Sequence, residues 1–138
     1  MDWTIEFDKA IEQYLPDLEV LQDEPMSRHT TFRIGGPAKR MAFPSSREQL
    51  VLLMSFAKDY GANPLVIGNG SNLLVPDEGL DRLVIDTSAN LNRVERGSGN
   101  TVLADAGATL ARTADLACKS GLTGLEFAHG IPGTVGGG

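Results

Sequence analysis

Apolar residues recur at helical spacing from residue 3 to residue 14, and Pro16 interrupts the pattern. Such spacing predicts an amphipathic helix whose apolar stripe packs against a core, and the proline sets its end. A second helical pattern runs from Leu50 to Ala57, and Gly61 supplies its C-terminal stop.

Polar residues mark where helices begin. Ser45 with Glu48, and Ser46 with Gln49, both fit a capping box at the start of the second helix. Thr109 is expected to cap a third helix in the same way, because its hydroxyl can accept a bond from a free amide of the first turn.

Short apolar runs between turn residues predict the strands. They cover residues 38–43, 64–67, 83–85, 91–94 and 101–104. The run at 64–67 is interpreted as a buried strand, and the order of strand, helix and strand predicts layered α/β subdomains within an α+β chain. We expect a subdomain boundary near residues 79–81, which divides the chain into 1–80 and 81–138.

The composition is that of a soluble globular protein, with 41% apolar and 22% charged residues among 138. The formal charge of −6 disfavours nucleic acids and anionic membranes as partners. The sequence shows neither a signal peptide nor an apolar run of bilayer length, so we expect a cytoplasmic protein. Cys118 is the only cysteine, which excludes an internal disulfide and a cysteine-rich zinc site. We expect it to be buried on a helix.

The segment Gly68-Asn69-Gly70-Ser71-Asn72-Leu73-Leu74 follows a predicted strand directly. Gly and Asn tolerate positive φ, and successive amides in such a loop form a nest for an anion, with a diphosphate as the natural occupant. The segment lacks the lysine of a P-loop. It also lacks the third glycine and helix onset of a Rossmann fingerprint, because residues 73–75 predict another strand. A hairpin turn between two strands explains the segment equally well.

A second glycine-rich segment covers residues 124–138 and contains six glycines among its fifteen residues. So few side chains allow a flat or extended ligand to approach the backbone closely. Ile131, Pro132 and Val135 are apolar and stiff, which favours a shaped loop over a flexible linker.

Three motifs, in this order, resemble the UDP-N-acetylenolpyruvoylglucosamine reductase family. They are HTTFRIGGPA at residues 29–38, VIGNGSNLL at 66–74, and GLEFA with GIPGTVGG between residues 124 and 137. The resemblance runs from about Glu19 to the last residue, and three long motifs in order are far more specific than one. Gly138 stands where the family often has alanine.

The resemblance implies an FAD-binding fold of the vanillyl-alcohol-oxidase type, with non-covalent FAD held between two subdomains. It places the FAD diphosphate over the first glycine loop and runs the second loop along the cofactor. The cofactor-binding residues expected on this basis are Val66, Ile67, Gly68, Asn69, Gly70, Ser71, Asn72, Leu73, Ala128, Ile131, Pro132, Gly133, Val135, Gly136 and Gly137.

The resemblance also implies the reaction. Hydride passes from NADPH through FAD to the enolpyruvyl group of UDP-N-acetylenolpyruvoylglucosamine, giving UDP-N-acetylmuramate for peptidoglycan. The family's proton donor, a serine or cysteine, and its stabilising glutamate and arginine lie further along the chain, so no catalytic residue is assigned. We expect an incomplete second subdomain, no substrate domain and an inactive chain. Another flavin oxidoreductase of this fold and a non-enzymatic nucleotide-binding module are the alternatives.

Four polar residues near the motifs have open roles. His29 and His129 are candidate metal ligands, bases or flavin attachment points, but two isolated histidines favour surface or hydrogen-bonding roles, and the family holds FAD without a covalent link. Arg33 can contact a phosphate or pair with an acid. Glu126 can accept hydrogen bonds from the cofactor or from backbone amides. No metal site is expected.

Overall fold

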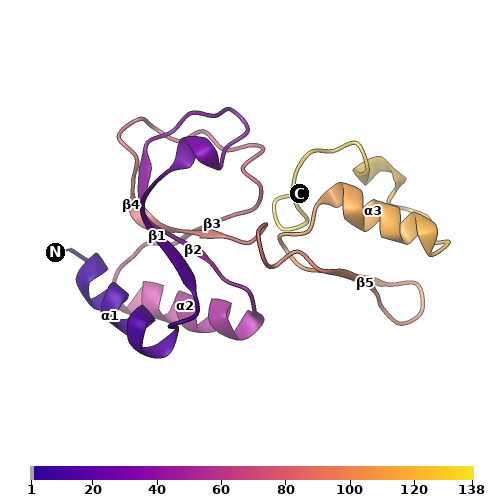
Figure 1. Cartoon of the computed structure of the whole chain (residues 1–138). Coiled ribbons are helices and arrows are strands. Elements are labelled where there is room, and N and C mark those ends of the chain that lie inside the picture. The colour runs from indigo at the N-terminus through magenta and orange to yellow at the C-terminus, as the bar shows by residue number, and fades with distance from the viewer. Residues whose placement is uncertain (1) are drawn as a thin grey trace.

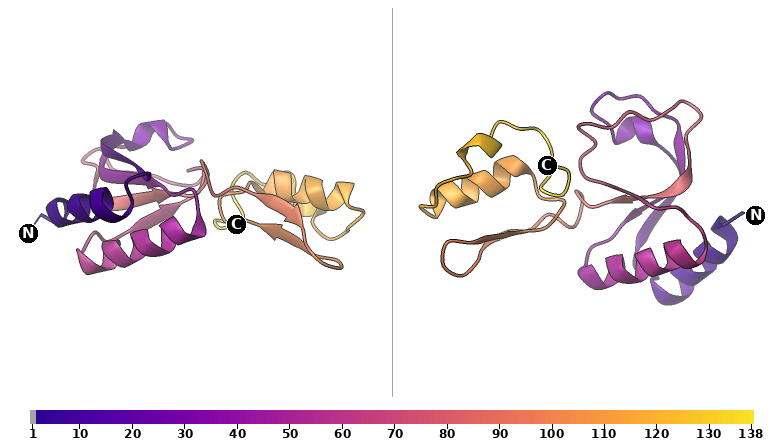
Figure 2. Two further views of the ribbon diagram at one scale, coloured as in Figure 1. Left: turned by 60° about the horizontal axis from the view of Figure 1, so that its bottom comes forward. Right: turned by 180° about the vertical axis from the view of Figure 1, so that it is seen from behind.

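Figure 1 shows the chain as a computed structural model, which describes residues 2–138. The helices are α1 (Thr4–Tyr14), α2 (Arg47–Asp59) and α3 (Leu110–Lys119), with short 3-10 helices η1 (Met26–Arg28) and η2 (Glu126–Ala128). The strands are β1 (Glu19–Pro25), β2 (Pro37–Phe43), β3 (Leu65–Ile67), β4 (Leu80–Asp86), β5 (Val94–Arg96) and β6 (Val102–Ala104). They form two parts, one ending with β4 and the other beginning with β5 (Figures 1 and 2).

The first part is built on a four-stranded sheet with the order β1-β2-β4-β3. β1 runs antiparallel to β2, whereas β2, β4 and β3 are parallel to one another. β4 therefore occupies an inner position, between β2 and β3, and the sheet continues to Asp86. The division expected at residues 80 and 81 would cut β4 from its own sheet, so we place it after Asp86.

Each face of the sheet buries its own apolar cluster. α1 and α2 cover one face (Figure 2), where Phe7 and Leu53 are fully buried. The loops that follow β1 and β3 cover the other face, where Met26 and Val75 pack with Val84 of β4. Burial of such side chains is the main stabilising contribution to a domain of this size. The strand β3 is less buried than expected, because it lies at the sheet edge and leaves Val66 51% exposed.

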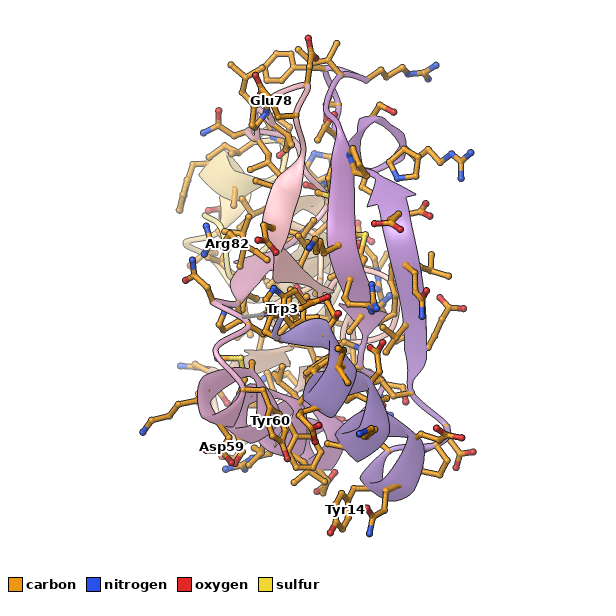
Figure 3. All side chains as sticks on the ribbon, turned by 90° about the vertical axis from the view of Figure 1, so that its left-hand side faces the viewer. Trp3, Tyr14, Asp59, Tyr60, Glu78 and Arg82 are labelled. Carbon is orange, nitrogen blue, oxygen red and sulfur yellow. The ribbon has the colours of Figure 1, made fainter. Side chains whose placement is uncertain are left out.

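Polar contacts tie α1 to the sheet. Arg40 of β2 donates from Nη2 and Nε to the carboxylate of Asp8, at 2.7 and 2.9 Å, and this carboxylate raises the pKa of Arg40. At the start of the helix, where Figure 3 labels Trp3, its Nε1 donates to Asp81 Oδ1 at 3.0 Å. The first helix is thus held to the sheet at its start and near its middle, as well as by its apolar stripe.

The predicted helix starts are largely confirmed. Ser46 is the N-cap of α2, where its hydroxyl accepts from the amide of Gln49 at 3.1 Å. Gln49 Oε1 in turn accepts from the amide and hydroxyl of Ser45, at 2.8 and 3.0 Å. Ser45 therefore pairs with Gln49 and not with Glu48, so the two expected boxes merge into one. Thr109 caps α3 by accepting from the amide of residue 112 at 3.1 Å.

The second part consists of an antiparallel β5-β6 hairpin, α3 and η2. The strand expected at 91–94 begins only at Val94, because Leu91 instead donates from its amide to the carbonyl of Thr87 at 3.0 Å in a turn. Cys118 is exposed, so its predicted burial is wrong. No helix within residues 2–138 has the length and apolar character needed to cross a membrane.

Candidate functional site

The two glycine loops meet in one cleft of about 400 Å³ at the junction of the two parts. The first loop follows β3, and the second follows η2 and returns toward the junction, where Figures 1 and 2 place the C-terminal end. The cleft is lined by Val66, Ile67, Gly68, Asn69, Gly70, Ser71, Asn72, Leu73, Ile131, Pro132, Gly133, Thr134, Gly137 and Gly138.

Two glycines of the first loop lie where a side chain does not fit. A Cβ on Gly68 would overlap the side chain of Thr134, which belongs to the second loop. A Cβ on Gly70 would overlap the carbonyl oxygen of His29, and Gly70 also has φ of +70°. Glycine is needed at both positions because other atoms lie directly against the backbone.

The first loop presents unused hydrogen-bond donors. Within residues 2–138, the amides of Gly68, Asn69, Gly70 and Asn72 donate to no protein acceptor. The amide of Ser71 donates to Asn69 Oδ1 at 3.3 Å, which closes a short turn. Neighbouring free amides form an anion-binding nest, and the cleft lining contains no charged side chain. A diphosphate fits such a site, because it needs several donors close to the backbone.

The second loop is docked on the residues that precede α3. Its amides at Val135 and Gly136 donate to the carbonyls of Ala108 and Ala106, at 2.8 and 2.9 Å. The amide of Leu110 donates to the carbonyl of Gly133 at 3.1 Å. This loop is therefore shaped by hydrogen bonds, as its apolar residues indicated, and it is not a flexible linker.

The structure brings together most of the residues expected at the cofactor site. Ala128, Val135 and Gly136 do not line the cleft: Ala128 is the last residue of η2 and only 4% exposed, and the other two dock the loop through the bonds described above. Thr134 and Gly138 line it and were not predicted. Thr134 lies inside the third motif, where the residues expected at the site are glycines and apolar residues and not a hydroxyl.

A larger polar cavity of about 730 Å³ adjoins the cleft and shares Asn69 with it. It is lined by Ser27, Arg28, His29, Thr30, Thr31, Arg33, Asn69, Asp86 and Ser88. Arg33 has φ of +57°, and no carboxylate within residues 2–138 lies within 4.0 Å of its guanidinium. Of the two roles left open for Arg33, the acid pair is therefore not formed. The guanidinium remains available to an anion.

The other polar residues near the motifs have more ordinary surroundings. Glu126 Oε2 accepts from the amide of Gly124 at 2.9 Å, and hydrogen bonds from its own amide and that of Gly124 lower the pKa of Glu126. His129 lines a third cavity of about 450 Å³ together with Asn69 and Ile131. No group of three or more His, Cys, Asp or Glu side chains suited to a metal ion occurs in the described part of the chain.

Comparisons with known proteins agree with this geometry. The pattern that defines the FAD binding domain family matches residues 38–138. A UDP-N-acetylenolpyruvoylglucosamine reductase of Caldicellulosiruptor bescii is 45% identical over 128 residues, which cover 91% of this chain and 40% of the relative. The chain thus spans about two fifths of the length of that curated relative.

Solved structures give the same result for the fold. The UDP-N-acetylenolpyruvylglucosamine reductase of Thermus caldophilus superposes with a TM-score of 0.59 at 33% identity, over 87% of this chain and 40% of that one. The glucooligosaccharide oxidase of Acremonium strictum superposes with a TM-score of 0.60 at 18% identity, over 83% of this chain and 25% of that one, and shows a shared fold alone. The expected vanillyl-alcohol-oxidase type of fold is confirmed. The chain belongs to the FAD-binding domain family, and within that family it is related to the UDP-N-acetylenolpyruvoylglucosamine reductases.

Proposed function

We propose that this chain is the FAD-binding portion of an NADPH-dependent reductase that converts UDP-N-acetylenolpyruvoylglucosamine into UDP-N-acetylmuramate. The family membership of residues 38–138 and the 45% identity to a reductase support this proposal. The observation that carries it is the cleft in which the two glycine loops meet and the first loop presents free amides.

In this proposal the diphosphate of FAD lies over the Gly68 to Leu73 loop, and the Ile131 to Gly137 loop runs along the cofactor. The free amides of the first loop donate to phosphate oxygens, while the glycines keep both backbones close to the ligand. The binding is non-covalent, and neither His29 nor His129 is an attachment point. The side chain of His29 is instead bonded to Glu24 at 3.0 Å.

When bound, FAD supplies the hydride chemistry, which amino-acid side chains do not provide. The residues of this chain bind and orient it: the cleft fixes the diphosphate, and two further cavities share Asn69 with the cleft. We assign no catalytic residue within this chain. The NADPH and UDP-sugar sites of the reductase, like its proton donor, are proposed to depend on sequence outside these 138 residues.

The experiment that tests the proposal measures bound flavin and turnover in the full-length polypeptide. The purified protein should carry FAD and oxidise NADPH only when the UDP-sugar is added. Gly70→Val should abolish flavin retention, because the added side chain overlaps the carbonyl of His29 and displaces the loop. Normal flavin content in Gly70→Val would contradict the placement of the diphosphate. FAD binding without substrate-dependent NADPH oxidation would favour a non-enzymatic module or another flavin enzyme.

The 138-residue chain alone provides a second test. We expect it to show no NADPH oxidation above the protein-free blank when FAD and the UDP-sugar are added. We also expect weaker FAD binding than in the full-length polypeptide, because the match covers only 40% of the related reductase. Substrate-dependent turnover by this chain would place the catalytic groups within it and contradict the proposal.

A further inference from the structure

The side chains of Glu24 and His29 form a shielded pair beneath the first glycine loop. His29 Nε2 lies 3.0 Å from Glu24 Oε1, and the two side chains are only 19% and 13% exposed. The imidazole also packs on Phe43, with ring centroids 6.0 Å apart. Since Glu24 belongs to β1 and Phe43 to β2, the ring of His29 is anchored to the sheet.

The main chain next to this ring touches the glycine loop. The carbonyl of His29 lies against Cα of Gly70, where any Cβ would overlap it. Two residues later, the amide of Thr31 donates to the carbonyl of Gly70 at 3.1 Å. The middle of the loop is therefore held on two sides by residues 29–31.

From these contacts we propose that the Glu24–His29 pair positions the Gly68 to Leu73 loop for the diphosphate of the cofactor. His29 is then a positioning residue: it acts through its own carbonyl and through Thr31, and not by touching the ligand. The inference rests on the proposed function, since it requires the diphosphate to occupy this loop.

The anchoring by the side chain adds to that of Met26, which packs in the apolar cluster on this face of the sheet, because the other hydrogen bonds of residues 29 and 30 are local. The amide of His29 donates to the carbonyl of Met26 at 2.9 Å, and the hydroxyl of Thr30 donates to the carbonyl of Ile34 at 3.0 Å. These bonds shape the turn but do not connect residues 29–31 to the sheet. Arg28 lies 3.6 Å from the same carboxylate, but its side chain is 69% exposed, so it holds the segment weakly.

Loss of the Glu24–His29 pair should affect the binding of one chemical class of ligand, those that carry a diphosphate. The amides of the loop are donors to phosphate, so displacement of the loop weakens the binding of ligands that carry a diphosphate. FAD and ADP contain this group, whereas riboflavin has the flavin ring without any phosphate. If the pair only stabilised the fold, its loss would lower the affinity for all three ligands together.

The test compares the affinities of FAD, ADP and riboflavin in variants of the full-length polypeptide. His29→Ala and Glu24→Ala should each lower the affinity for FAD and for ADP by about tenfold, which is the effect of losing one well-placed hydrogen bond. The affinity for riboflavin should change by less than about twofold. His29→Gln should restore most of the affinity, because its amide nitrogen can donate to Glu24 from a similar position.

Asp8→Ala is the matched control, because it breaks a partly buried pair with Arg40 that also joins an element to the sheet but lies away from the loop. It should lower the unfolding temperature without changing the preference for FAD over riboflavin. If the unmodified protein itself shows no such preference, the proposed function fails. Where the unmodified protein does prefer FAD, three results for His29→Ala and Glu24→Ala would contradict the positioning role. The variants could bind all ligands as the unmodified protein does, bind all three ligands equally more weakly, or fail to fold.

Discussion

The side chain of Thr134 occupies the space that a Cβ on Gly68 would need, so the two glycine loops meet through this contact. Thr134 is 3% exposed and comes from the second part of the chain, whereas Gly68 follows β3 of the first. The width of the cleft between the loops depends on this contact, since its lining includes both residues.

A substitution at Gly68 should therefore act across the cleft. Gly68→Ala is expected to push the loops apart and weaken FAD binding by about tenfold or more, an effect of the size that steric overlap in a packed region produces. Combining it with Thr134→Ala removes Oγ1 and Cγ2, which are the two atoms closest to the new Cβ. Flavin fluorescence titration should show partial recovery in the double variant, and additive losses would contradict the contact.

Arg33 is expected to contribute charge to the site. Its guanidinium has no carboxylate within 4.0 Å among residues 2–138, and it lines the polar cavity that shares Asn69 with the cleft. Arg33→Ala should weaken FAD binding by roughly threefold to tenfold at low salt, and the loss should shrink as salt is added. Lys58→Ala removes the same charge from α2 and should have no effect. Equal losses in both variants would indicate only a change in net charge.

The second loop offers a position where size can be changed without strain. Gly137 lines the cleft, a Cβ there would make only an ordinary contact with Thr134 Oγ1 at 3.5 Å, and its φ is not in the left-handed region. Gly137→Leu should weaken FAD binding by filling the cleft, while Gly137→Ala should weaken it less. Gly133→Leu is a poorer probe, because Gly133 has φ of +129° and any side chain there strains the backbone. The unfolding temperature of both Gly137 variants should stay within about 2 °C of the unmodified protein.

Local patterns in the sequence predicted the helices and most strands, because these depend on neighbours a few residues away. The Ser46 cap of α2, the Thr109 cap of α3 and the end of α1 before Pro16 are examples. The burial of Cys118 was wrong for a geometric reason. The buried face of α3 carries Ala114 and Ala117, and the next position is turned by about 100° from that face.

Features set by distant contacts were harder to predict. Residues 73–75 were expected to form a strand, but no strand pairs with them in the described residues. The next residue, Pro76, accepts at its carbonyl from the amides of Gly36 and Gly79, at 2.9 and 3.0 Å, in a turn. The inner position of β4 depends on pairing with β2, more than thirty residues earlier, so turn residues alone placed the boundary too early. Within the candidate site, the glycine loops were evident in the sequence. The contact of Thr134 with Gly68 and the Glu24–His29 pair became visible only in the structure.

Nitrogen-15 NMR of the backbone amides of the first loop, in the full-length polypeptide, tests directly whether the diphosphate lies over this loop. Adding FAD or ADP should shift the resonances of Gly68, Asn69, Gly70 and Asn72, because these free amides would donate to the diphosphate. Riboflavin, which lacks phosphate, should leave them nearly unchanged. If FAD binds but these four resonances stay in place while others move, the diphosphate does not lie over this loop and the account is wrong.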